Sequence, residues 1–384
     1  MQTRPRAVIV GTGFMGRVHL EALRRLGFVD VVAVVGTTVA KARALADAFG
    51  IDRATDDHLS CVTDPSIHAV HICTPNSRHF AIAAAALDAG RHVLCEKPLA
   101  MTSAEAARLM TRAAEQRLRN CTCHNLRFYP MVQQMRRMRE AGELGEILIV
   151  QGTYSQDWLL FDTDWNWRVE RQHAGPLRAM GDIGSHWCDM MEHVTGLRIR
   201  ALCADLATFH ETRKRPAAMS DTFTGKASGP REAVDAAVDT EDFGSVLLRV
   251  GERARGAFTV SQVSAGCKNR LSLEVFGTKA SVAWNQERPD ELWIGRRDQA
   301  NEIVLKDPSL LAQSARSYSD LPGGHSEGYD DTFKQLFRRF YQSILDPGAV
   351  VDYPQFSDGL RQMQLLEATL ASHERRGWVE LVGD

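Results

Sequence analysis

Two short segments of the sequence carry side chains suited to proton transfer. Lys97 stands in the tripeptide Glu-Lys-Pro, and Asp182 precedes His186 by four residues. An ammonium group stabilises negative charge that develops on a hydroxyl oxygen, and a histidine that titrates near neutrality accepts the hydroxyl proton. On a helix beginning near Asp182, the carboxylate and the imidazole would share a face, and the carboxylate would favour the protonated ring. This combination is typical of a site that oxidises an alcohol.

A glycine-rich segment near the N-terminus predicts a nucleotide site. Gly11-Thr-Gly13-Phe-Met-Gly16 follows the apolar run of residues 7–10 and opens a helical pattern. Gly11 permits a tight turn, Gly13 lets the backbone approach a pyrophosphate, and Gly16 lets the helix pack closely on the strand. The helix N-terminus offers free N–H groups to the anion. A glycine turn without a ligand is the alternative, which the strand-to-helix context disfavours.

The second strand of such a unit usually ends with an acid that binds the ribose of NAD. Here Gly36 takes that place, and Thr37, Thr38 and Lys41 follow it. Nothing in this segment repels the 2′-phosphate of NADP, but the segment also contains no arginine that would bind this phosphate and favour NADP. The sequence therefore leaves NAD and NADP both open as the cofactor.

The elements that must position these groups alternate along the first 125 residues. Helical patterns separate five apolar runs that we interpret as strands, at residues 7–10, 31–35, 69–73, 92–95 and 120–123. This alternation predicts βαβ units and a doubly wound parallel sheet, which binds ligands at the carboxyl ends of its strands. We therefore expect a Rossmann domain over residues 1–125, with Lys97 at the ligand-binding edge.

The pattern changes in residues 126–384. Residues 257–263 and 270–276 alternate apolar and polar positions, as half-buried strands of an antiparallel sheet do. The polar segment 209–240 has no clear period and predicts a long surface loop, whereas the apolar stripe over 333–344 predicts a late helix. The expected fold class is α/β, with an N-terminal Rossmann domain and a C-terminal α+β domain with a large open, mostly antiparallel sheet for substrate binding and oligomerisation.

The composition excludes several classes of protein. The 384 residues include 46 Lys and Arg against 48 Asp and Glu, a balance that lacks the basic excess of a nucleic-acid binder. No apolar run approaches the roughly 18 residues of a membrane span, and the first residues lack a secretory pattern. We expect a cytoplasmic protein that binds neither nucleic acid nor membrane.

Metal patterns in the sequence are weak. Cys121-Thr-Cys123 has no distant partner pair, and we interpret it as part of a buried strand. A second set falls on adjacent helical faces but lacks a supporting motif: Asp182, His186, Asp189 and His193. We therefore expect no metal site, and no disulfide framework among the eight cysteines.

Three segments together resemble the glucose-fructose oxidoreductase, inositol dehydrogenase and MocA family (Gfo/Idh/MocA). They are Cys73-Thr-Pro-Asn76 with His79, Cys95-Glu-Lys-Pro98, and Gly181-Asp-Ile-Gly-Ser-His186, and the likeness extends from Gly11 to the terminal helices. The resemblance implies an NAD(P)-dependent dehydrogenase acting on a secondary alcohol of a sugar, cyclitol or sugar derivative. It implies a homodimer or homotetramer formed through the C-terminal sheet. It also implies that Lys97, Asp182 and His186 act together, with His186 as the base.

The resemblance further implies a set of cofactor-binding residues, which lie in the glycine segment and at the ends of the strands. They are Gly11, Gly13, Phe14, Met15, Gly16, Gly36, Thr37, Thr38, Lys41, Thr74, Pro75, Asn76, His79, Glu96, Lys97 and Asn125. Two alternative functions stay open beside the dehydrogenase. One is a non-catalytic dinucleotide-binding regulator, and the other is an oxidoreductase that retains its cofactor and shuttles hydride between two sugars.

The segment 154–168 offers a mixture of groups that suits a sugar. Amide and guanidinium groups bind hydroxyls, and an indole covers an apolar sugar face. The segment resembles that of the levoglucosan-dehydrogenase-like members of the family, which implies that Gln156, Trp158 and Arg168 face the substrate together with Asp182 and His186. Trp165 and Trp167 are equally well interpreted as core aromatics. His325, after two glycines, lies either at a loop tip near the pocket or on the surface.

One stretch departs from the family pattern. The family's usual approach to the aspartate is glycine-rich, whereas this chain has Ala174-Gly-Pro-Leu-Arg-Ala-Met180, with bulky Arg178 and Met180. The departure predicts a different wall beside the catalytic aspartate, so the sugar cannot be transferred from any one relative.

Overall fold

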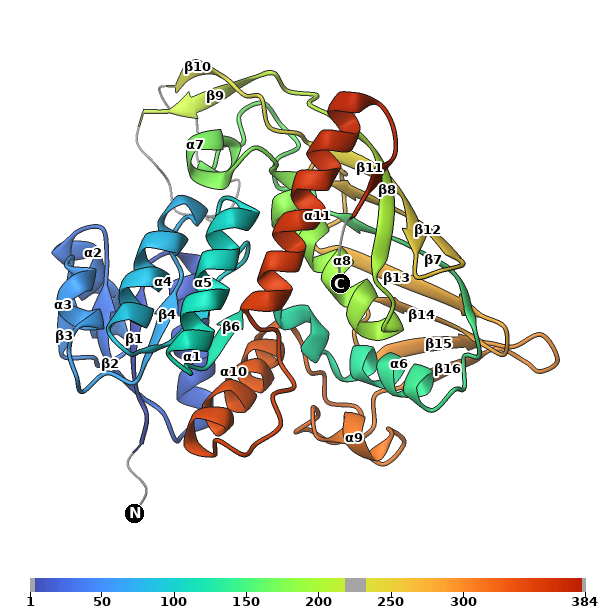
Figure 1. Ribbon diagram of the computed structural model, residues 1–384, viewed down its shortest axis with the longest axis horizontal. Coiled ribbons are helices and arrows are strands. Elements are labelled where there is room, and N and C mark those ends of the chain that lie inside the picture. The colour runs from blue at the N-terminus through green and yellow to red at the C-terminus, as the bar shows by residue number, and fades with distance from the viewer. Residues whose placement is uncertain (1–3, 218–232, 382–384) are drawn as a thin grey trace.

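The computed structural model describes residues 4–217 and 233–381 of the chain. Within them, a sheet of six parallel strands has the order β3-β2-β1-β4-β5-β6 (Figure 1). The strands are β1 Arg6–Val10, β2 Asp30–Val35, β3 Arg53–Thr55, β4 Ala69–Ile72, β5 His92–Cys95 and β6 Asn120–Thr122. The doubly wound parallel sheet is thereby confirmed. The sequence did not predict β3, because its three residues at the edge of the sheet form no apolar run.

Helices cover both faces of this sheet. They are α1 Phe14–Leu26, α2 Val39–Ala48, α3 His58–Val62, α4 His79–Asp88 and α5 Ser103–Glu115, with the short turn η1 Asn76–Arg78 before α4. Because side chains alternate along a strand, Ala7 and Ile9 of β1 pack with α1 and α2, and Val8 and Val10 pack toward α3, α4 and α5.

A helix from late in the chain completes the first of these faces. The predicted stripe forms α10 (Tyr329–Leu345), whose aromatic side chains Phe333, Phe337 and Phe340 are buried against α1 and β4. The late helix is confirmed, but its packing on the N-terminal sheet was not predicted, because an apolar stripe does not specify its partner. The domain boundary near residue 125 stays a prediction.

The second sheet contains nine strands in the order β16-β15-β14-β13-β7-β12-β11-β8-β17 (Figure 1). They are β7 Ile147–Ser155, β8 Ile199–Ala207, β11 Phe243–Val250, β12 Ala254–Ser261, β13 Arg270–Gly277, β14 Ser281–Asn285, β15 Glu291–Gly295, β16 Glu302–Leu305 and β17 Val379–Glu380. All pairs are antiparallel except β7 with β12, which confirms the large, mostly antiparallel sheet.

Helices of the C-terminal part pack on one face of this sheet, between it and the N-terminal sheet (Figure 1). The remaining helices and turns are η2 Asn125–Phe128, α6 Pro130–Glu140, η3 Trp167–Val169, α7 Arg171–Ala174, η4 Met180–Gly184, α8 Ser185–Thr195, α9 Gln313–Arg316 and α11 Phe356–Arg375. On the opposite face, Ile149 and Leu247 are 48% and 52% exposed. In the described ranges, no helix combines the length and apolarity that a bilayer crossing requires.

The segment 209–240 differs from its prediction as a long surface loop. Its described part contains an antiparallel hairpin of β9 (Thr212–Pro216) and β10 (Ala233–Ala237). Residues 218–232 of the predicted loop lie outside the described residues. The sequence of the hairpin shows no apolar–polar alternation, because the one side chain that β9 buries is the charged Arg213.

Candidate active site

A cavity of about 880 Å³ lies at the carboxyl ends of the parallel strands, where doubly wound sheets bind ligands. Twelve predicted cofactor residues line it: Gly11, Gly13, Phe14, Met15, Gly36, Thr37, Lys41, Thr74, Pro75, Asn76, Glu96 and Lys97. The opposite wall comes from the C-terminal part and includes Trp167, Arg168, Gln172, His173, Ala174, Leu177, Arg178 and Asp182. The cavity therefore joins the glycine segment to two of the three predicted catalytic residues.

The three glycines play different roles in this wall. Gly11 has a φ of +122°, and a Cβ there would lie 2.4 Å from the carbonyl oxygen of Cys73. A Cβ on Gly16 would lie 2.1 Å from the carbonyl oxygen of Gly11, whereas a Cβ on Gly13 would meet no atom within 4 Å. Gly11 and Gly16 are thus required by packing, and Gly13 leaves open space at the N-terminus of α1.

We expect Gly13→Ala and Gly16→Ala to have opposite signatures. Gly13→Ala should leave the melting temperature unchanged but weaken NADH binding about tenfold or more, because the new methyl group enters the space open to a pyrophosphate. Gly16→Ala should destabilise the fold by about 1–3 kcal/mol, because the methyl group collides with backbone. Thermal melts and NADH fluorescence titrations check both. Equal melting temperatures for the two variants would contradict this assignment.

Packing explains why no acidic residue stands at position 36, at the end of the cavity where we place the adenosine. A Cβ on Gly36 would lie 2.9 Å from the backbone nitrogen of Ala42 and the carbonyl oxygen of Thr38, so no acidic side chain fits there. Thr38 does not line the cavity but caps α2, because its hydroxyl accepts a hydrogen bond from the backbone N–H of Lys41. The structure adds Asp56 and His58 to this end.

Two other predicted cofactor residues are buried supports outside the cavity lining. The ring nitrogens of His79 lie 2.8 and 2.9 Å from the carbonyl oxygens of Pro98 and Thr74, so the ring holds two of the loops that form the site. Asn125 donates a hydrogen bond of 2.7 Å to the hydroxyl of Thr332 on α10. Both residues therefore join segments of the chain in this structure.

Glu96 is held by a buried histidine that the sequence did not reveal. Its carboxylate lies 3.0 Å from Nε2 of His19 and accepts a 3.2 Å hydrogen bond from the backbone N–H of Lys97. Burial raises the pKa of Glu96, but the hydrogen bond and charge of His19 outweigh burial and bring that pKa below its usual value. The chain of contacts continues from His19 to His71 at 3.0 Å and from His71 to the Tyr341 hydroxyl at 2.9 Å. Helix α10 is thereby linked to the loop of Lys97.

Several of the groups considered as metal ligands have other partners in this structure. The two cysteines of the Cys-x-Cys pattern are buried within and directly after β6, as predicted. Asp189 pairs with Arg127, and His193 contacts Gln133. In the described ranges, His19, Glu96 and Cys123 bring three ligand atoms within 4.8 Å of one another, and two of them already share the 3.0 Å hydrogen bond.

Lys97 and Asp182 form the central ion pair of the cavity. The Lys97 ammonium lies 2.8 Å from Oδ1 of Asp182 and 2.7 Å from its carbonyl oxygen. Arg168 Nε donates to Oδ1 at 3.2 Å, and Gln262 Nε2 donates to Oδ2 at 2.9 Å. Burial raises the pKa of Asp182, but the charges of Lys97 and Arg168 overcome burial and hold that pKa well below its usual range. Asp182 is therefore ionised at neutral pH.

His186 differs from its predicted pairing. Asp182 lies in the π-helical turn η4, and His186 lies in α8, so no regular helix begins at the aspartate. Lys97, Arg168 and Gln262 donate to the Asp182 carboxylate. Within the described residues, this carboxylate makes no hydrogen bond to His186. Burial, with the charge of Lys97 and the neighbouring His124, brings the pKa of His186 well below its usual value. The charge of Asp182 does favour the protonated ring, as expected, but burial and Lys97 outweigh it, so the imidazole is neutral at neutral pH.

The ring of His186 has two aromatic neighbours. His124 lies perpendicular to it, with 5.5 Å between ring centroids, and the ring of Tyr154 lies at 6.4 Å. His186 Nδ1 is buried and has no hydrogen-bond partner within residues 4–217 and 233–381. His186 as a whole is 7% exposed and is not among the residues that line the cavity.

The predicted sugar-facing groups lie at the end of β7. Gln156 donates to Oδ1 of Asn269 and accepts from the indole N–H of Trp158, both at 2.8 Å, and the Tyr154 hydroxyl donates to the same Asn269 oxygen. Asn269 was not predicted, because it follows Gln156 by more than a hundred residues. The structure thus collects amide, hydroxyl and indole groups in one cluster.

The other members of this stretch lie in different surroundings. Arg168 stacks over the indole of Trp167, with 4.5 Å to the ring centroid. Trp158 and Trp165 pack on a small apolar cluster of Leu159, Val169 and Val238. His325 is exposed and is not among the residues that line the cavity.

Comparison with known proteins gives the family. Residues 5–124 match the model described as an oxidoreductase family with an NAD-binding Rossmann fold, and residues 132–283 match the GFO/IDH/MocA C-terminal domain. The chain belongs to the Gfo/Idh/MocA family. It is 30% identical to the levoglucosan dehydrogenase of Pseudarthrobacter phenanthrenivorans over 97% of both chains.

Solved structures of Gfo/Idh/MocA proteins agree with this assignment. A levoglucosan dehydrogenase in complex with NADH and L-sorbose has a TM-score of 0.88 at 29% identity, and the match covers 100% of both chains. An inositol dehydrogenase homolog from Azotobacter vinelandii, complexed with NAD+, has a TM-score of 0.85 at 27% identity, covering 98% of this chain and 97% of that one. The protein is an NAD-dependent oxidoreductase of this family.

Proposed function

We propose that this protein is a dehydrogenase that transfers hydride between nicotinamide and a secondary alcohol carbon of a sugar, cyclitol or sugar derivative. The observation that carries the proposal is the ion pair of Lys97 and Asp182 in the wall of the nucleotide cavity. The polar cluster at the end of β7, with its indole, suits a polyhydroxylated substrate. The relatives named as levoglucosan and inositol dehydrogenases support the same substrate class.

The residues of the cavity fit a dinucleotide. The open space at Gly13 and the N-terminus of α1 suit its pyrophosphate, and Gly36, Thr37 and Lys41 would lie at its adenosine end. When bound, NAD supplies the hydride acceptor at C4 of its nicotinamide ring. Lys41 supplies a positive charge at this end that could bind a 2′-phosphate, so NADP belongs in the assay beside NAD.

Lys97 and His186 would divide the proton chemistry between them. The Lys97 ammonium would stabilise negative charge on the substrate oxygen, and the neutral His186 would accept the hydroxyl proton. Because Nδ1 of His186 is buried, we assign proton transfer to Nε2. Asp182 would hold Lys97 and Arg168 in place as an ionised partner.

The test is a substrate panel. The purified protein is mixed with NAD or NADP and with cyclitols, pyranoses and anhydrosugars, and the absorbance of reduced nicotinamide is followed. Reduced cofactor that forms with the native protein and is lost in Lys97→Met supports the proposal. A protein that binds NADH, oxidises no panel member and reduces none of the corresponding ketones would instead be a regulator. Activity only with two sugars together, and slow cofactor exchange, would indicate the hydride-shuttling alternative.

The open face of the nine-stranded sheet supports a second part of the proposal. Leu247 of β11 and Ile149 of β7 are about half exposed there, and large apolar residues exposed on an open sheet face are typical of a subunit interface. We propose a homodimer or homotetramer through this face. Sedimentation of the native protein and of Leu247→Asp checks the proposal, which predicts a smaller particle for the variant.

A further inference from the structure

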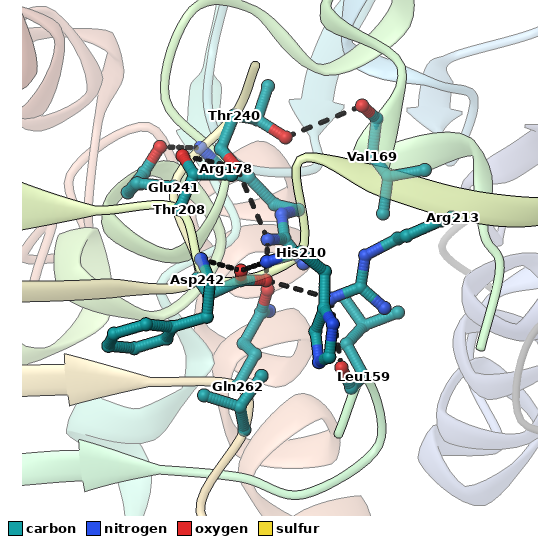
Figure 2. A network of polar contacts seen from close by, with 12 residues as sticks. Leu159, Val169, Arg178, Thr208, His210, Arg213, Thr240, Glu241, Asp242 and Gln262 are labelled. Atoms are coloured by element: carbon teal, nitrogen blue, oxygen red, sulfur yellow. Dashed lines mark hydrogen bonds and ion pairs between the residues drawn. The ribbon is translucent and has the colours of Figure 1, made fainter. Parts of the chain in front are cut away.

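Two arginines and one aspartate form a buried cluster beside the cavity, which we call the arginine–aspartate cluster: Arg178, Arg213 and Asp242. Figure 2 shows both guanidinium groups converging on the Asp242 carboxylate. The side chains of all three are fully buried. Arg178 and Arg213 both donate to Oδ1 of Asp242, the latter at 2.8 Å. The cluster therefore joins the segment before η4, the β9 hairpin and the residue before β11 at one oxygen atom.

Arg213 extends from this oxygen to the predicted sugar-facing stretch. Its guanidinium donates to the carbonyl oxygens of Leu159 at 2.9 Å, Phe161 at 2.8 Å and Asp164 at 3.2 Å. These carbonyls belong to the irregular segment between Trp158 and Arg168. A planar guanidinium that binds three carbonyls at once fixes the path of such a segment.

Arg178 lies at the start of the segment that carries Asp182. Its carbonyl oxygen accepts the backbone N–H of Asp182 at 2.7 Å, and its own N–H donates to Glu241 at 2.9 Å. A second link runs through Gln262, whose backbone N–H donates to the carbonyl of Asp242 and whose side chain donates to Asp182. The Arg178 side chain anchors this segment by donating to Asp242 and to the carbonyl oxygen of Thr240. The anchored main chain and the side chain of Gln262 then hold Asp182 through its backbone N–H and its carboxylate.

The charge of the cluster is unusual for a purely structural feature. Two guanidinium groups share one carboxylate, and the Nε atoms of Arg178 and Arg213 have no hydrogen-bond partner in the described ranges. Burying charge costs free energy, and well-packed apolar side chains often stabilise a core as well as a buried ion pair does. The geometry suggests that this cost is offset by holding the two neighbouring segments in place.

We propose that Arg213 and Arg178 are positioning residues of the dehydrogenase, a proposal that rests on the function proposed above. Arg213 sets the sugar-facing segment and therefore sugar affinity. Arg178 sets Asp182 and therefore the ion pair with Lys97. This assigns a role to the bulky residue by which the chain departs from the glycine-rich family pattern.

The test separates the two roles. Because two arginines share one carboxylate, Arg213→Met and Arg178→Met each leave a neutral pair with Asp242, so both variants should fold. We expect Arg213→Met to raise the KM for the sugar about tenfold with kcat within about twofold of native. We expect Arg178→Met to lower kcat about tenfold to a hundredfold with a smaller change in KM. NADH affinity should stay within about twofold in both.

Matched variants distinguish positioning from stability. Arg213→Lys keeps a charge for Asp242 but cannot bind three carbonyls, so it should restore the melting temperature without restoring KM. Lys214→Met, on the same strand but with an exposed ion pair to Asp235, should change neither constant. If Arg213→Met does not fold, Arg213→Lys takes its place in the KM measurement. Native KM and kcat in the folded variants would overturn the proposal.

A measurement without substrate keeps this inference separate from the proposed function. Amide hydrogen exchange of residues 157–168 should be faster in Arg213→Met than in the native protein and unchanged in Lys214→Met. Inactivity of the native protein toward every sugar and cyclitol overturns the proposed function alone. Unchanged exchange in the Arg213 variants overturns the positioning role.

Discussion

Replacing His186 by asparagine is expected to lower kcat/KM for alcohol oxidation by about 10²–10⁴-fold, the range that a positioned general base contributes. Asparagine is polar and smaller than histidine, so the melting temperature should change little, in contrast to the large loss of kcat/KM. NADH affinity should be retained, because the ring does not line the nucleotide cavity. Steady-state kinetics and an NADH titration provide the measurement.

The pH dependence of the native protein tests the same assignment. A base must be unprotonated to act, and burial beside Lys97 brings the pKa of His186 below its usual value near 6.5. The rate of oxidation should therefore stay level from about pH 6.5 upward as far as this group is concerned, and fall as the solution becomes more acidic. His325→Asn, at an exposed position, is the matched control and should retain the native profile. An acid limb centred above pH 7 would contradict the assignment.

Asp182→Asn is expected to affect both catalysis and stability. The neutral side chain leaves Lys97 and Arg168 without their shared anion, and we expect kcat to fall about 10²–10³-fold, as when a preorganised electrostatic group is removed. The free energy of unfolding at pH 7 should fall by about 3 kcal/mol, the low end for one partner of a buried pair, because the carboxylate is 16% exposed.

The stability effect of this substitution has a predicted pH dependence. The folded-state pKa of Asp182 lies below the ordinary 3.8, so its ionised form contributes stability above that pH and loses the contribution as the pH falls. The difference in melting temperature between native protein and variant should therefore be large at pH 7 and shrink in acid. Asp320→Asn is a control, because charged neighbours also bring the pKa of Asp320 down to about 2, but it does not line the cavity. It should lose stability in the same direction with native kcat.

Local patterns were sufficient where the physics is local. The five apolar runs and the Gly11-to-Gly16 segment predicted the parallel sheet and its nucleotide edge, because strand alternation and glycine turns depend on neighbours in the chain. The same reasoning missed β3 and the β9 hairpin, whose short polar strands carry no period. It also placed a regular helix at Asp182, where the chain forms a π-helical turn.

The sequence by itself determined the fold class, the cavity edge and the identity of Lys97, Asp182 and His186 as candidates. Only the tertiary structure decided how they are paired. Gln262 is eighty residues from the aspartate that it holds, and Arg213 lies some fifty residues from the carbonyls that it binds. Partners at such separations are selected by the packing of two sheets and the cost of burying unpaired polar groups, which no spacing in the chain records.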